Sequence, residues 1–220
     1  MKDNNLIIWD FDGVLFDSLR ECIIVLQISL KLIKETNDPI ERLDVNNLQF
    51  KSETNDLLKK MRPLRPYVIK GQDYIWQYLN FEKFDKNQEL HLDYKKIFDT
   101  FFNPEQDKIF KSIFYKARKI LQNTLNEDYY KIFVPYNGAL KAFRESLKNY
   151  SNTNYICSAR DYCSINYVLN HHDIQLDKNK IFSKDHSFNL KPVNLTKKEQ
   201  IEAIVYFEES INKKFTVVED

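Results

Sequence analysis

The sequence predicts an α/β fold in which a parallel, Rossmann-like sheet is interrupted by an inserted α-helical domain. A short apolar run at residues 6–9 ends in acidic residues and a glycine, as buried parallel strands with a functional loop do. Strand-like and helix-like segments alternate after residue 135. Between these regions, residues 39–134 carry helical periodicity and many aromatic residues, with almost no strand signal.

The periodic segments define the expected elements in order. A helix is expected over residues 18–34, where apolar side chains recur at helical spacing until Asp38-Pro39 ends the pattern. Within the insertion we expect helices over 73–79, 94–102 and 106–125. Beyond it we expect helices over 138–150, 161–171 and 196–209, and strands over 153–157, 181–182 and 215–218. Residues 1–16 and 135–220 should therefore form the α/β core, and residues 17–134 the helical insertion.

Bulk composition narrows the class of protein. The 220 residues suffice for a sheet core with an inserted domain. The formal net charge of +1 offers no basic face for nucleic acid, and no segment is long and apolar enough for a membrane span. Three sparse cysteines do not resemble a disulfide framework, so a cytoplasmic location is expected. The oligomeric state stays open.

Two acids follow the first predicted strand. Residues i and i+2 of an extended strand point the same way, so Asp10 and Asp12 should share the ligand side while Phe11 points away. Gly13 permits a turn that a side chain would resist. Two repelling carboxylates suit Mg²⁺, and a carboxylate can attack phosphorus while its neighbour transfers a proton. The competing interpretation is an ordinary Asp-Gly turn.

Residues 10–18, Asp-Phe-Asp-Gly-Val-Leu-Phe-Asp-Ser, closely resemble the first motif of the haloacid dehalogenase-like hydrolases. The resemblance implies that Asp10 is the nucleophile, which forms an aspartyl-phosphate, and that Asp12 is the general acid and base. It also implies that the Asp10 carboxylate and the Asp12 main-chain carbonyl ligate Mg²⁺. Because actual dehalogenases of the family lack the second Asp, Asp12 indicates phosphate chemistry.

The family's second motif is a hydroxyl residue that ends the next core strand and holds the phosphate. Tyr-Ile-Cys-Ser-Ala-Arg at residues 155–160 resembles it and places Ser158 at the strand's end. Free main-chain N–H groups before a helix would complete the cradle, so Ser158, Ala159 and Gly13 are the candidate phosphate-binding residues. Ser158 could instead only cap the following helix.

The third motif is a lysine that neutralises phosphate and nucleophile. Thr196 and Glu199 match a capping box, which places Lys197 and Lys198 in the first helical turn, where the helix dipole disfavours cations. This local conflict suggests a function. We prefer Lys198, because it stands three residues before Ile201, the first expected buried position. Lys197 and Lys191 remain candidates, and both lysines of the helix could simply be solvated.

The fourth motif is an acidic pair that completes the metal site. Residues 215–220, Phe-Thr-Val-Val-Glu-Asp, resemble it, which implies that Asp220 ligates Mg²⁺ and Glu219 assists. Relatives usually continue beyond this point, so the core is expected to be truncated at its C-terminus, and its activity in this form is open.

The insertion lies where family members carry a helical, C1-type cap, which closes over the site and recognises the leaving group. Arg62, Arg65 and Lys70 cluster near two prolines and Gly71 and could bind a second anionic group of a substrate. A solvated basic loop explains them more readily. Arg118 is a weaker candidate of the same kind.

These expectations combine into a Mg²⁺-dependent phosphatase that hydrolyses a small phosphorylated metabolite. A phosphomutase on the same scaffold is one alternative. A non-catalytic protein that binds a phosphorylated ligand is another, although intact Asp10 and Asp12 would have no role in it.

Overall fold

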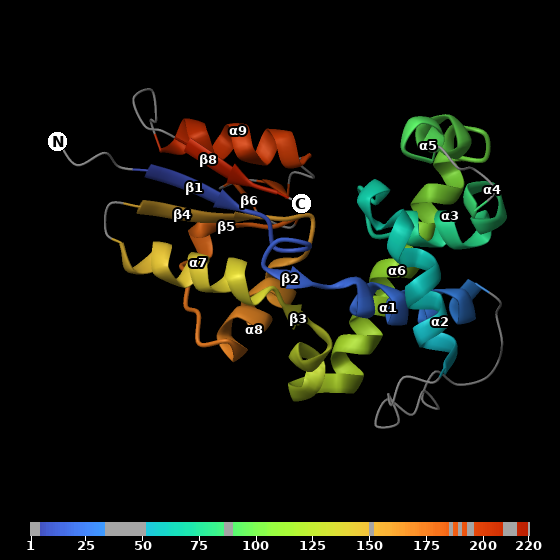
Figure 1. Ribbon diagram of the computed structural model, residues 1–220, viewed down its shortest axis with the longest axis horizontal. Helices are drawn as coiled ribbons and strands as arrows, with labels where there is room; N and C mark the ends of the chain where they lie inside the picture. Colours follow the sequence, from blue (N-terminus) through green and yellow to red (C-terminus); the bar gives the residue numbers. More distant parts are fainter. Residues whose placement is uncertain are drawn as a thin grey trace. The chain divides into compact units, whose positions relative to one another are not determined.

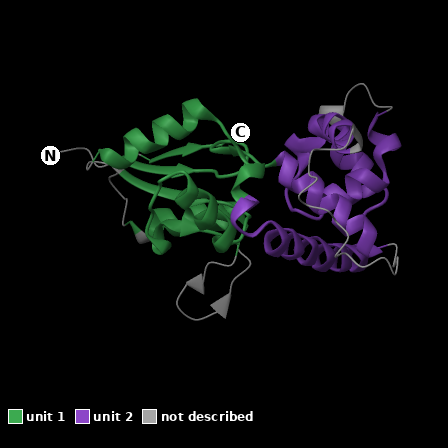
Figure 2. Cartoon of the chain, turned by 90° about the horizontal axis from the view of Figure 1, so that it is seen from below, with its two compact units in different colours: residues 1–18, 130–220 green, residues 19–129 purple. Residues whose placement is uncertain are grey.

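The computed structural model of the chain describes residues 5–33, 52–85, 90–149, 152–184, 187–188, 191–192, 196–208 and 215–219. The chain forms two compact units, which Figure 2 colours separately. Residues 1–18 and 130–220 make the α/β unit, and residues 19–129 make the helical unit. The chain thus passes between the units at 18/19 and 129/130, where the sequence suggested 16/17 and 134/135.

A parallel sheet is the centre of the α/β unit. Its strands are β1 (Asn5–Trp9), β4 (Asn152–Cys157), β5 (Ile181–Phe182) and β8 (Phe215–Val218). They lie in the order β5-β4-β1-β8, and each neighbouring pair is parallel. Helix α9 (Lys197–Phe207) covers one face, and α7 (Asn137–Lys148) and α8 (Tyr162–His171) lie on the other (Figure 1). The predicted α/β fold is confirmed.

Alternating side chains of β1 explain why helices cover both faces of the sheet. Leu6 and Ile8 point to one face and share a buried cluster with Ile204 of α9. Trp9 points the other way, and its ring lies 5.3 Å from the ring of Phe143 in α7. Because both faces of β1 are apolar, the strand is stable only in the middle of a covered sheet.

Short strand pairs complete the α/β unit. β2 (Phe16–Asp17) pairs antiparallel with β3 (Val134–Pro135), and these strands lie where the chain leaves the unit and returns to it. β6 (Ser187–Phe188) and β7 (Lys191–Pro192) form a second antiparallel pair, preceded by the short helix η5 (Lys178–Lys180). These four short strands were not predicted from the sequence.

The helical unit consists of α1 (Leu19–Ile33), α2 (Ser52–Met61), η3 (Arg62–Tyr67), α3 (Asp73–Leu79), α4 (Phe81–Asp85), α5 (Leu90–Asp99), α6 (Pro104–Leu125) and the start of η4 (Asn126–Ile132). α1 packs against α6. The indole of Trp76 contacts the rings of Phe98, Phe101, Phe102 and Phe110, so the aromatic residues of this region build a core. None of the helices in the described ranges is both long and apolar enough to cross a membrane.

The observed helices differ from the predicted ones mainly at their starts. α6 begins at Pro104, because Asn103 accepts hydrogen bonds from the N–H groups of Glu105 and Gln106 and a proline fits the first helical turn. α5 begins four residues before its predicted start. α2 and α4 were not predicted. The capping box of Thr196 and Glu199 at the start of α9 is confirmed.

Candidate active site

The candidate site lies in the α/β unit, at the carboxyl ends of the parallel strands. Asp10 directly follows β1, Ser158 follows β4 and Glu219 follows β8. The Asp10 N–H donates to the Val218 carbonyl at 3.0 Å, and the Ser158 N–H donates to the Phe182 carbonyl at 2.9 Å. These main-chain bonds continue the parallel registers past the strand ends, so residues that are far apart in the sequence meet at one edge.

The loop after β1 has the conformation expected from its sequence. Phe11 is fully buried, and its ring packs against Phe16 at 4.9 Å, so it points away from the polar edge. The N–H groups of Leu15 and Phe16 both donate to the Phe11 carbonyl, which folds the loop back on itself. Gly13 has a φ of 96°, a value that side chains disfavour. The prediction that Gly13 permits this turn is confirmed.

Asp10 is held by its own loop and by a lysine. Its Oδ1 accepts a hydrogen bond from the Phe11 N–H at 2.7 Å, and its Oδ2 lies 2.5 Å from Lys197 Nζ. The same ammonium lies 3.0 Å from Glu219 Oε1. One cation therefore sits between two carboxylates that come from neighbouring strands.

The choice of Lys198 as the phosphate lysine is wrong for this geometry. The Lys198 side chain is 85% exposed and pairs with Glu202, whereas Lys197 points into the site. The reason is the register of α9: its first buried position is Gln200, a polar residue, rather than Ile201. Lys197 stands three residues before Gln200 and therefore shares the face of the helix that packs on the sheet.

The environment keeps Lys197 charged. Burial alone would lower the pKa of its ammonium group, but the negative charge of Asp10 and the hydrogen bonds to Asp10 and Glu219 raise that pKa above its usual value. Lys197 thus carries a full positive charge beside Asp10 at neutral pH.

Asp12 lies in a second polar cluster with Ser158 and Arg160. Ser158 Oγ donates to Asp12 Oδ2 at 3.3 Å and accepts from the Arg160 N–H at 3.1 Å. Arg160 Nη2 donates to Asp12 Oδ1 at 2.9 Å. Asp12 and Ser158 are thus brought together as predicted, whereas Arg160 was not predicted as a site residue. A basic residue two positions after Ser158, in a turn at the active edge, was the available signal.

Other predicted site residues lie elsewhere or outside the description. Asp220 lies outside the described residues, and of Lys191 only the main chain is described, in β7. Ala159 is exposed in the turn between Ser158 and Arg160. Within the described ranges, no group of three or more His, Cys, Asp or Glu side chains could hold a metal ion.

The donors that are described suit a hard cation. Asp10 and Glu219 supply carboxylate oxygens, which Mg²⁺ prefers as ligands. Both carboxylates contact the Lys197 ammonium, so this edge of the sheet already binds one positively charged group.

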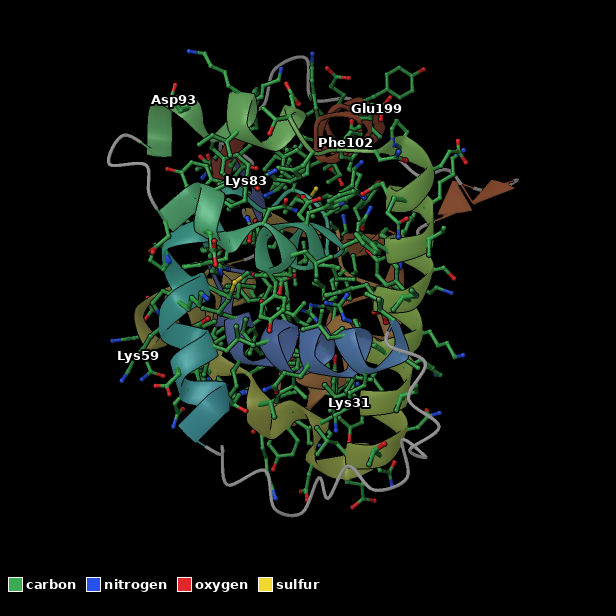
Figure 3. The ribbon with its side chains drawn as sticks, turned by 90° about the vertical axis from the view of Figure 1, so that its right-hand side faces the viewer. Lys31, Lys59, Lys83, Asp93, Phe102 and Glu199 are labelled. Atoms are coloured by element: carbon green, nitrogen blue, oxygen red, sulfur yellow. The ribbon has the colours of Figure 1, made fainter. Side chains whose placement is uncertain are left out.

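The basic residues of the insertion belong to the helical unit. Arg62 is exposed and lines a surface cavity together with Asn55, Leu58, Lys59 and Pro63. Figure 3 shows the Lys59 side chain projecting outward from α2. Arg65 is half-buried in η3, and Lys70 is exposed before α3. Arg118 is buried in an ion pair with Glu21, so it is no candidate for binding a substrate.

Comparisons with known proteins identify solved structures of the same fold. One is described as a putative phosphoglycolate phosphatase from Lactobacillus plantarum, with a TM-score of 0.53 and 10% identity, over 100% of this chain and 78% of the other. Another is a haloacid dehalogenase-like hydrolase from Streptococcus pneumoniae, with a TM-score of 0.51 and 13% identity, over 100% of this chain and 77% of the other. No protein-family model matches the chain, and no curated protein matches it.

Proposed function

We propose that this chain, which has the fold of the haloacid dehalogenase-like hydrolases, is a Mg²⁺-dependent phosphatase. The observation that carries the proposal is the pairing of Asp10 with Lys197 at the carboxyl end of β1, beside the cluster of Asp12 and Ser158. A carboxylate nucleophile, a fixed cation, a hydroxyl group and a second carboxylate are the parts that phosphoryl transfer through an aspartyl-phosphate needs.

In the first step, a carboxylate oxygen of Asp10 attacks the phosphorus of a phosphomonoester, and the bond from phosphorus to the leaving oxygen breaks. Asp12 gives its proton to that oxygen, so the alcohol leaves neutral. Lys197 compensates negative charge on the phosphoryl oxygens, and Ser158 offers its hydroxyl group as a hydrogen-bond donor.

In the second step, water attacks the aspartyl-phosphate. Asp12 takes a proton from the water, the bond between Asp10 and phosphorus breaks, and inorganic phosphate is released. Asp10, the carbonyl of Asp12 and Asp220 would hold Mg²⁺, with help from Glu219. The bound ion would neutralise charge on the transferred group.

The proposed substrate is a small phosphorylated metabolite, and the helical unit is the proposed source of selectivity for the leaving group. Arg62, Arg65 and Lys70 are its candidate contacts for a second anionic group. One matched structure is described as a putative phosphoglycolate phosphatase, so phosphoglycolate belongs in any substrate panel.

The test is release of inorganic phosphate from a panel of phosphomonoesters, with and without Mg²⁺. We expect turnover that EDTA abolishes and Mg²⁺ restores, and that Asp10→Asn reduces to the level of a blank. Rapid acid quench should trap a phosphoryl group on the peptide that contains Asp10, and hydroxylamine should remove it.

Asp173→Asn is the matched control, because it makes the same chemical change on an exposed residue of the α/β unit. Asp173 has a φ of 56°, which asparagine adopts readily, so the variant should match the native activity. Loss of activity in both variants, or turnover that survives Asp10→Asn, would refute the proposal. Isomerisation of a sugar phosphate without phosphate release would instead identify a mutase, and ligand binding without turnover a non-catalytic protein.

A further inference from the structure

The two charged pairs of the active site are built differently. Lys197 reaches Asp10 with a flexible side chain that is 36% exposed. Arg160 reaches Asp12 with a side chain that is only 1% exposed, although Asp12 itself is 28% exposed. Its Nε lies 3.1 Å from Asp12 Oδ1 and 3.2 Å from Oδ2, and its Nη2 lies 2.9 Å from Oδ1. The planar guanidinium therefore contacts both carboxylate oxygens with a rigid arrangement of donors, which a lysine ammonium lacks.

Arg160 is itself fixed on several sides. Its N–H donates to Ser158 Oγ, and its carbonyl accepts from the Lys184 N–H at 3.0 Å. Its guanidinium carbon lies 4.9 Å from the centre of the Phe133 ring and 5.9 Å from that of Phe11. A cation against aromatic rings, with its main chain bonded in a turn, has little freedom to change its direction.

We propose that Arg160 is a positioning residue that holds the carboxylate of Asp12 in the orientation needed for both proton transfers. The inference rests on the proposed phosphatase function. Asp12 must meet the leaving oxygen in the first step and a water molecule in the second. Because Arg160 contacts both oxygens of the Asp12 carboxylate, that carboxylate keeps one orientation through both steps.

Direct binding of the phosphate by Arg160 is the competing role. The described contacts favour positioning, because Nε and Nη2 both point at Asp12 and the side chain is almost fully buried. Turning the guanidinium toward a phosphate would break the ion pair and leave the Phe133 and Phe11 rings. Lys197, which is more exposed and has a flexible stem, is better suited to follow a phosphoryl group.

A double-mutant cycle between Arg160 and Asp12 separates the two roles. Arg160→Lys keeps the charge and loses the planar fork, so we expect kcat to fall by about tenfold to a hundredfold, with KM within about threefold of the native value. In an Asp12→Asn background, the same change should lower the residual kcat by less than about threefold, because the group that it positions is gone. Arg160→Gln serves as a second variant if Arg160→Lys folds poorly.

Arg118→Lys is the matched control. Arg118 forms the same kind of buried pair with Glu21, through Nε at 2.8 Å and Nη2 at 3.1 Å, but it lies in the helical unit. The control should lower the melting temperature as Arg160→Lys does while leaving kcat per folded molecule within about twofold of the native value. An equal loss of kcat in both variants would make Arg160 merely structural and would overturn the proposal.

Binding of inorganic phosphate by calorimetry gives a readout without turnover. Positioning predicts that Arg160→Lys leaves this affinity within about threefold, whereas a loss of about tenfold or more would assign Arg160 to the phosphate and overturn the proposal. If the native protein hydrolyses no ester, the phosphatase function fails separately. Crystal structures of the native protein and of Arg160→Lys then test the positioning role. An Asp12 carboxylate with the same orientation in both structures would overturn it.

Discussion

Cys157 illustrates how its surroundings decide the chemistry of a single side chain. It is buried at the end of β4, and its Sγ donates to Gln200 Oε1 at 3.0 Å. Burial raises the pKa of its thiol to about 12; the charge of Lys197 opposes this effect, and those of Asp10 and Glu219 add to it. A protonated, hydrogen-bonded thiol is a poor nucleophile, so Cys157 is a packing residue although it lies next to Ser158.

This environment predicts that Cys157 resists alkylation. At pH 8, with a pKa of about 12, a fraction of only about 10⁻⁴ of the thiol is ionised, so iodoacetamide should leave Cys157 unmodified in the native protein. Cys163 is exposed and should be modified under the same conditions. Peptide mass spectrometry measures both sites, and denatured protein should react at all three cysteines. Equal rates at Cys157 and Cys163 in native protein would contradict the assignment.

Residues of the site were predictable from sequence where a local pattern encodes them. Asp10 and Asp12 are neighbours in one motif, and Ser158 ends a strand, so each carries its signal locally. The predicted lysine, Lys198, is one position after the observed one. The reason is that Gln200 is buried but polar, so a pattern of hydrophobic residues does not reveal it as a buried position. Arg160 was not predicted, because its place two positions after Ser158 is only a weak signal and its contact with Asp12 joins residues 148 positions apart.

The start of α9 determines the direction of the Lys197 side chain. Thr196 Oγ1 accepts from the Glu199 N–H, and Glu199 accepts from the Thr196 N–H at 2.7 Å. The Thr196 hydroxyl and N–H lower the pKa of the Glu199 carboxyl. A lowered pKa means that this stabilisation is present above the usual pKa of glutamate and is lost as pH falls through the lowered value. The capping box therefore fixes the first turn at neutral pH.

Thr196→Ala should accordingly lower the free energy of unfolding by about 1 kcal/mol, because it removes the side-chain acceptor for the start of α9. Thr196→Ser keeps the hydroxyl and should remain within a few tenths of a kcal/mol of the native protein, about the limit of measurement. Urea denaturation at pH 7 gives both values. The difference between native and Thr196→Ala should shrink as pH is lowered through the pKa of Glu199; a difference that grows would contradict this account.

Helices and strands could be predicted where their buried apolar residues recur at a regular spacing. The central strands and the helices of the α/β unit follow from the sequence, because most of them bury apolar side chains at a regular spacing. α2 (Ser52–Met61) was missed because its ten residues contain only three large apolar side chains. β6 and β7 each have two residues, too few for any period to appear. The predicted start at residue 106 was two positions late, because α6 begins at Pro104.

At the scale of the whole molecule, the helical unit is a continuous segment with its own core. Glu21 of α1 is fully buried and accepts hydrogen bonds from Arg118 of α6 and from the Tyr129 hydroxyl at 2.9 Å. The pair thus joins the first turn of the unit to its last helices. A buried carboxylate without its cation costs stability. The packing of α1 on α6 therefore depends on the ion pair between Glu21 and Arg118.

We therefore expect residues 19–129 to fold as an isolated fragment, with a helical circular dichroism spectrum and a cooperative thermal transition. Arg118→Met should lower the free energy of unfolding by about 3–5 kcal/mol, because it buries the Glu21 charge without that cation. Adding Glu21→Gln to Arg118→Met should restore part of this loss, because no charge is then left in the site. Denaturant titration of the fragment and of the whole chain measures these effects. A fragment that melts without cooperativity, or a double variant less stable than Arg118→Met, would contradict the assignment of this core to the helical unit alone.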